Sequence, residues 1–231
     1  MNYKFKLEKE ASVEGIGDIF YGEARFNAAR NLFKKNNLQW IAARDLAGAR
    51  ILTGANSSLC RRGSLVREGN LSIPKRHSST DKVKRLLLRT PIIVLDLDGI
   101  VSASPIYGGE INIDKKYAEL QEQAGEDYDN PVFELKSTQP IPTNRLSEEA
   151  LPIWLFGDKA QEYGALLEEE GVNEIFLGFD TADYINKYNH VYVCQLYMND
   201  FRKVHCSEIL GISTRCESTC PVRGIHYYGK K

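Results

Sequence analysis

The chain of 231 residues is long enough for one domain, or for one domain with a small lobe, and it can bury a substantial core. Its 42% hydrophobic and 26% charged residues are typical of a globular protein, and its net charge of −1 excludes a global attraction to nucleic acid. No stretch approaches the ~18 apolar residues of a membrane span, and the first residues lack the apolar run of a signal peptide. We therefore expect a cytoplasmic protein without a membrane partner.

The first 85 residues predict a pair of helices followed by basic loops. Apolar residues recur near helical spacing over 18–35 and again over 39–48, and this stripe fits either core packing or a dimer interface. Residues 53–80 are rich in Gly, Ser, Asn and basic side chains, which is typical of loops and short strands.

Basic side chains gather between residues 61 and 89 in a chain that is otherwise balanced. They are Arg61, Arg62, Arg67, Lys75, Arg76, Lys82, Lys84, Arg85 and Arg89, with only Glu68 and Asp81 among them. A local basic groove is what binding to phosphates requires, although a solvated face of loops and strands has the same composition. If DNA is the ligand, we expect contacts from Arg61, Arg62, Lys75 and Arg76.

An apolar run over 86–101 gives the clearest strand, and it contains Asp96-Leu97-Asp98-Gly99. This sequence is similar to the first motif of haloacid dehalogenase-type phosphatases, whose first aspartate is the nucleophile and whose second is the general acid. The resemblance implies phosphoryl transfer by Asp96 and Asp98 with Mg²⁺. Lys159, Asp180 and Asp183 match the later motifs of that family only loosely, and a strand followed by a turn explains the same residues.

A helix is expected over 114–124, and a tight hairpin is expected after it. An Asp-Asn-Pro turn at 129–131 precedes an apolar run. With the turn centred before the proline, Asp127 lies opposite Glu134, at the roughly 5 Å Cβ separation of cross-strand partners. Lys136 shares their face, because residues two apart on a strand point the same way. Two carboxylates and an ammonium can bind Mg²⁺ and activate water beside a phosphate.

This Asp…Glu-x-Lys pattern resembles the PD-(D/E)xK nucleases, and above all the type II restriction endonucleases that read Glu-Leu-Lys-Ser in a core strand. The resemblance implies that Asp127 and Glu134 are ligands of Mg²⁺ and that Lys136 is the catalytic lysine. The gap between Asp127 and Glu134 is shorter than is usual in the family, so Asp129 is an alternative ligand.

The same resemblance implies an α/β fold, with a mixed central β-sheet flanked by helices in a restriction-endonuclease-like core. That catalytic core would cover 86–231, and 1–85 would serve in dimerisation or DNA binding. The expected partner is double-stranded DNA, bound by a homodimer because a two-fold symmetric site calls for a two-fold symmetric protein.

Beyond the hairpin, helices are expected over 147–152, 158–170 and 181–188, and a strand over 174–178. The β-branched and aromatic run 191–198 predicts a central strand, paired with 201–206. The odd count of five cysteines argues against a disulfide framework. Cys206, Cys216 and Cys220 with His205 and His226 form either a small zinc site or a set of unconnected thiols and imidazoles.

Two alternatives stand beside the Mg²⁺-dependent endonuclease. One is the phosphatase that uses Asp96 and Asp98. The other is a non-enzymatic binding or inhibitor protein, for example one borne by a phage, in which both acidic motifs have only structural roles.

Overall fold

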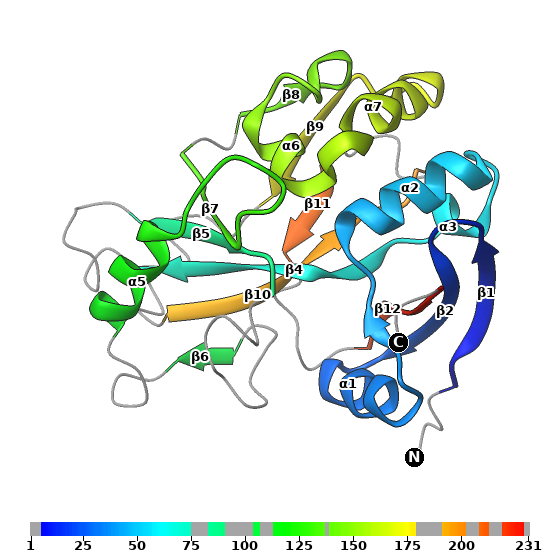
Figure 1. The fold of residues 1–231 in the computed structure, drawn as a ribbon, viewed down its shortest axis with the longest axis horizontal. Helices are drawn as coiled ribbons and strands as arrows, with labels where there is room; N and C mark the ends of the chain where they lie inside the picture. Colours follow the sequence, from blue (N-terminus) through cyan, green and yellow to red (C-terminus); the bar gives the residue numbers. More distant parts are fainter. Residues whose placement is uncertain are drawn as a thin grey trace.

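A mixed sheet organises the protein (Figure 1). The computed structural model describes residues 6–74, 83–90, 104–106, 113–136, 139–178, 191–201, 208–212 and 219–228. The strands of the main path follow the order β1 (Glu8–Val13), β2 (Gly17–Ala24), β12 (Cys220–Tyr227), β4 (Ser64–Ile73), β10 (Val191–Met198), β11 (Glu208–Ile212), β9 (Glu174–Gly178) and β8 (Ile141–Pro142).

Four further strands branch from this path. β5 (Lys84–Leu88) pairs with β4 and with β7 (Val132–Glu134), while β3 (Gln39–Trp40) pairs with β12 and β6 (Ser104–Ile106) pairs with β10. β2 and β12 pair antiparallel along their whole length, so strands from the two ends of the sequence lie side by side.

Helices cover the sheet in separate groups (Figure 1). α2 (Ala43–Thr53), α6 (Ala150–Phe156) and α7 (Ala160–Glu169) pack against one another, and the short helices α3 (Ser58–Arg61), η2 (Thr143–Arg145) and η3 (Gly157–Lys159) connect to them. α1 (Phe26–Lys35) packs on β12 and β3, and α5 (Ile113–Glu122) packs on β7. The largest cluster of buried apolar residues lies under α2, α6 and α7, with Trp154 fully buried within it.

The sequence of α1 accounts for its position. Phe26, Ala29 and Phe33 are buried and recur at the spacing of one helix face. Trp40 of β3 receives this face: its ring lies 5.1 Å from the ring of Phe26 and 4.7 Å from that of Phe33, centroid to centroid. The helix ends before Asn37, whose φ of 52° is left-handed and is well tolerated by asparagine.

Several elements differ from the sequence-based predictions. The helix predicted over 18–35 is wrong in its first part, since β2 occupies Gly17–Ala24 and α1 begins at Phe26. The strands predicted over 174–178 and 191–198 are confirmed as β9 and β10. The predicted boundary between residues 85 and 86 falls within β5. The helix predicted over 181–188 lies outside the described residues, as does most of the strand predicted over 201–206.

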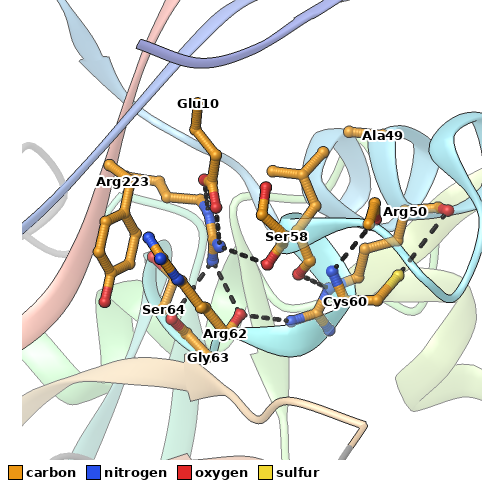
Figure 2. Close-up of polar contacts among 12 residues, drawn as sticks. Glu10, Ala49, Arg50, Ser58, Cys60, Arg62, Gly63, Ser64 and Arg223 are labelled. Carbon is orange, nitrogen blue, oxygen red and sulfur yellow. Dashed lines mark hydrogen bonds and ion pairs between the residues drawn. The ribbon is translucent and has the colours of Figure 1, made fainter. Parts of the chain in front are cut away.

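A buried ion pair joins the two ends of the chain (Figure 2). Arg223 of β12 donates two hydrogen bonds to the carboxylate of Glu10 on β1, at 2.6 and 2.9 Å. Its remaining terminal nitrogen donates to the carbonyls of Arg62 and Gly63, at 3.1 and 3.3 Å. The side chain of Arg223 is fully buried and that of Glu10 is 5% exposed. Water therefore reaches neither charge well, and each charge is compensated by the other.

A second buried arginine, Arg50, contacts the segment between α3 and β4 from the side of α2 (Figure 2). Arg50 of α2 donates to the carbonyls of Leu59 and Asn199, both at 2.9 Å, and to the hydroxyl of Tyr163 at 2.8 Å. The segment from α3 to β4 is thus fixed between α2, α7 and the end of β10.

We predict that Arg223→Leu lowers the free energy of unfolding by about 3–5 kcal/mol, because it leaves the carboxylate of Glu10 buried and unpaired. Arg61→Leu is the matched control: Arg61 is exposed and donates to Asn56, and its loss is expected to cost less than about 0.5 kcal/mol. Urea unfolding followed by circular dichroism measures both changes.

The double variant Glu10→Leu/Arg223→Leu should recover part of the loss, because it removes the unpaired charge. A double variant no more stable than Arg223→Leu would show that the buried carboxylate is not the cause.

Candidate functional site

A groove with a volume of about 330 Å³ opens between β7, β8 and the start of α6. It is lined by residues 133–136 and 139–142, by 149–151, and by Glu126 and Arg145. Its volume lies at the lower end of the roughly 300–1,000 Å³ typical of ligand sites. The groove therefore has room for a small molecule or for one or two side chains of a larger partner.

The floor of the groove is apolar. Leu135, Ile141 and Leu151 are partly buried and pack against the main core. Phe133 also lines the groove, and its ring lies 5.8 Å from that of Trp154, centroid to centroid. An apolar group that enters the groove would thus contact side chains already fixed by the core.

The groove meets β7 at its edge. Side chains of successive strand residues point to opposite faces of a sheet. Because all of residues 133–136 line the groove, the groove lies at the edge of the strand and not over one face. The N–H of Leu135 donates to the carbonyl of Arg85 at 3.2 Å, and the N–H of Arg89 donates to that of Pro131 at 2.9 Å. The backbone groups of odd-numbered residues therefore face β5, and those of Glu134 face the opposite edge.

The charged rim of the groove is mostly paired internally. Lys136 Nζ lies 3.9 Å from the carboxylate of Glu126, and both side chains are exposed. Arg145 pairs with Glu149 at 2.7 Å, and also with Glu148 on the outer side at 3.2 Å.

Glu134 is the exception on this rim. Its carboxylate accepts a hydrogen bond from Gln121 of α5 at 3.4 Å, and none of the cations in the described part of the chain lies within ion-pair distance of it. Burial raises the pKa of Tyr117 on the same helix, and the negative charge of Glu134 raises that pKa further.

Arg89 fixes the loop that borders the groove. It donates to the carbonyls of Tyr128 and Trp154, both at 2.6 Å, and its guanidinium carbon lies 3.9 Å from the centroid of the Trp154 ring. Glu68, which is fully buried, lies 3.4 Å from the same guanidinium. Burial lowers the pKa of Arg89, and the charge of Glu68 opposes that change.

The predicted hairpin around the Asp…Glu-x-Lys motif is wrong. The backbone N–H of Asp127 donates to the side chain of Asn130 at 3.1 Å, and the N–H of Asn130 donates back to the carbonyl of Asp127 at 3.2 Å. This turn closes before β7 begins, and β7 pairs with β5 instead of with the segment around Asp127. Glu134 and Lys136 line the groove, whereas Asp127 and the alternative ligand Asp129 do not.

The other predicted site residues lie away from the groove or outside the described residues. Arg61 is exposed and donates to Asn56, and the guanidinium carbon of Arg62 lies 4.7 Å from the centroid of the Tyr21 ring. Lys75, Arg76, Asp96, Asp98, His205, Cys206 and Cys216 are not among the described residues, while Cys220 and His226 belong to β12. In the described part of the chain, no three metal-ligating side chains of His, Cys, Asp or Glu gather.

Sequence reasoning missed the groove itself. The apolar floor draws on β7, β8 and α6, which come together only through tertiary packing. The local signal was the alternation of Phe133 and Leu135 with Glu134 and Lys136, which is typical of a strand with one buried and one accessible face.

Comparison with known proteins identifies the fold. No family model and no curated protein matches the sequence. A solved structure, studied for how the C-type lectin fold accommodates massive sequence variation in Nanoarchaeota, is similar over 98% of this chain and 100% of its own, with a TM-score of 0.58 and 13% identity. The chain has a C-type lectin fold.

The prediction of a restriction-endonuclease-like core is therefore wrong. In the C-type lectin fold of this chain the sheet is organised by the pairing of β2 with β12, which lie at opposite ends of the sequence. The predicted core instead paired the strand of Glu134 and Lys136 with the segment around Asp127, whereas β7 pairs with β5. Among the described helices, none is long and apolar enough to cross a membrane.

We predict that Arg89→Met lowers the free energy of unfolding by at least about 2 kcal/mol, because hydrogen bonds from a charged donor to two carbonyls are lost. It should also expose the peptide bond after Tyr128 to chymotrypsin. Arg44→Met is the matched control, since Arg44 also lies over the Tyr128 ring, at 4.7 Å, but pairs with the exposed Asp158. Mass spectrometry of timed digests gives the rate of cleavage. Equal rates in the two variants would contradict the role assigned to Arg89.

Proposed function

We propose that this protein is a non-enzymatic binding protein, with the C-type lectin fold as its scaffold and the groove between β7, β8 and α6 as its ligand site. The observation that carries the proposal is the similarity to a C-type lectin fold over 98% of the chain. The similar protein was studied for the sequence variation that its fold accommodates. A fold that accommodates sequence variation suits recognition of ligands.

The composition of the groove supports the same proposal. It combines an apolar floor at Phe133 and Leu135 with a rim of charged side chains, which is the usual arrangement in ligand sites. The predicted hydrolysis of a phosphodiester with Mg²⁺ would need Asp127 beside Glu134, and Asp127 is held in the preceding turn by Asn130. The groove is therefore better suited to binding than to metal-assisted hydrolysis.

We expect the protein to leave supercoiled plasmid intact in the presence of Mg²⁺, because Asp127, the predicted second ligand, does not line the groove beside Glu134. Agarose electrophoresis after prolonged incubation measures this, with an EDTA-treated sample and Glu134→Ala as controls. Nicking that disappears both with EDTA and in Glu134→Ala would restore the nuclease hypothesis.

A fragment screen tests the binding site directly. With isotope-labelled isoleucine methyl groups, fragments that occupy the groove should shift the methyl resonance of Ile141, which lies in its floor. Ala150→Trp should abolish these shifts, because Ala150 lines the groove and the larger side chain fills it. Ala28→Trp, on the exposed face of α1, is the matched control and should leave them unchanged. Fragments that leave Ile141 unshifted, or that bind equally well to Ala150→Trp, would contradict the proposal.

A further inference from the structure

We infer that the groove binds an extended, basic peptide, which adds to β7 as a further strand. This inference rests on the proposed function of the groove. The observations that lead to it are the main-chain groups of Glu134 and the charge of its side chain, which forms no ion pair with a cation of the described residues.

The main chain of β7 offers a hydrogen-bonding edge to the groove. Because the N–H of Leu135 donates to the carbonyl of Arg85 in β5, and the carbonyl of Pro131 accepts from Arg89 just after β5, the N–H and C=O of Glu134 point away from β5. Among the described strands, β5 alone pairs with Glu134. An incoming strand about 4.8 Å from β7 would reach both groups.

The start of this edge is already occupied by the chain itself. Ala124 forms a parallel bridge with Val132, and the N–H of Gly125 donates to the carbonyl of Val132 at 3.0 Å. From Glu126 the chain turns away into the loop that Arg89 holds. The ligand strand would therefore begin where the pairing of Ala124 and Gly125 ends, and the protein's own segment shows that this edge accepts a strand.

The side chains around the edge define the ligand sequence. A ligand residue opposite Glu134 shares its face, so a Lys or Arg there would supply the cation that Glu134 lacks among the described residues. The two neighbouring ligand residues face the other way, toward Phe133 and Leu135. The groove thus favours an aliphatic–basic–aliphatic sequence.

The charge of the rim distinguishes a peptide from a nucleic acid. Three carboxylates, those of Glu126, Glu134 and Glu149, line the groove beside the cations of Lys136 and Arg145. Both cations already pair with carboxylates. A phosphate backbone would meet net negative charge here, whereas a basic peptide would meet an attractive field.

An N-methyl scan tests the inference. The ligand is a seven-residue blocked peptide in which valine and threonine flank a central lysine, and each backbone nitrogen is methylated in turn. If the peptide pairs with β7, methylation should weaken binding about tenfold at the nitrogen that donates to the carbonyl of Glu134 and leave the two adjacent nitrogens unchanged, because the N–H groups next to it face away from the strand. The measurement is a titration followed by the Ile141 methyl resonance.

Replacement of the lysine by norleucine tests the role of Glu134. It should weaken binding to the wild type severalfold and should have no effect on binding to Glu134→Gln. Glu122→Gln is the matched control, since Glu122 is exposed on α5 and does not line the groove. Equal losses on norleucine substitution in the wild type and in Glu134→Gln would overturn the assignment of the basic residue.

The outcomes separate this inference from the proposed function. If fragments shift Ile141 but the peptide does not bind, or binds with no single methylation-sensitive nitrogen in the scan, strand addition is wrong and the groove remains a ligand site. If neither fragments nor peptide shift Ile141, both proposals are wrong.

Discussion

The buried pair of Arg223 and Glu10 is the interaction on which the arrangement of the sheet depends, because its partners are 213 residues apart in sequence. Neither charge can stay buried without the other, so β1 and β12 must be in place together. The same guanidinium holds the carbonyls of Arg62 and Gly63, and Arg50 binds the neighbouring carbonyl of Leu59 (Figure 2). The connection from α3 to β4 is thereby fixed from both sides, and β4 enters the sheet in one register.

A second set of charged contacts connects the core to the residues on either side of the groove. Glu68 of β4 is fully buried and accepts a hydrogen bond from the N–H of Ala43, at the start of α2, at 2.9 Å. Its other oxygen lies 3.4 Å from Arg89, which in turn binds the carbonyls of Tyr128 and Trp154. The loop and the helix on either side of the groove are therefore positioned by one continuous set of buried contacts. A ligand would meet a site that is already formed, which lowers the entropy lost on binding.

Local sequence patterns predicted the elements whose formation depends on local residues. The β-branched run of β10, the strand β9 and the helix close to α7 all lie where periodicity placed them. The error at β2 has a different origin: Ile19 and Phe20 also fit a helical pattern, and β2 becomes a strand because β1 and β12 supply its backbone partners. Neither partner follows from residues nearby in sequence. The groove was missed for the same reason, since its floor joins Phe133, Ile141 and Leu151 from three elements.

The Asp…Glu-x-Lys motif shows that a short sequence pattern does not predict which strands pair. Glu134 and Lys136 share a face on any strand, and both line the groove, but Phe133 and Leu135 line it as well, so spacing alone does not explain their common place. The position of Asp127 depends instead on which segment pairs with β7, and that segment is β5. Had the hairpin formed, its first strand would have covered the edge of β7 and satisfied the backbone of Glu134. Because Asn130 closes the turn early, Asp127 stays outside, and the edge that a metal-binding hairpin would have filled faces the groove. The departure from the nuclease pattern and the proposed peptide site thus have one structural cause.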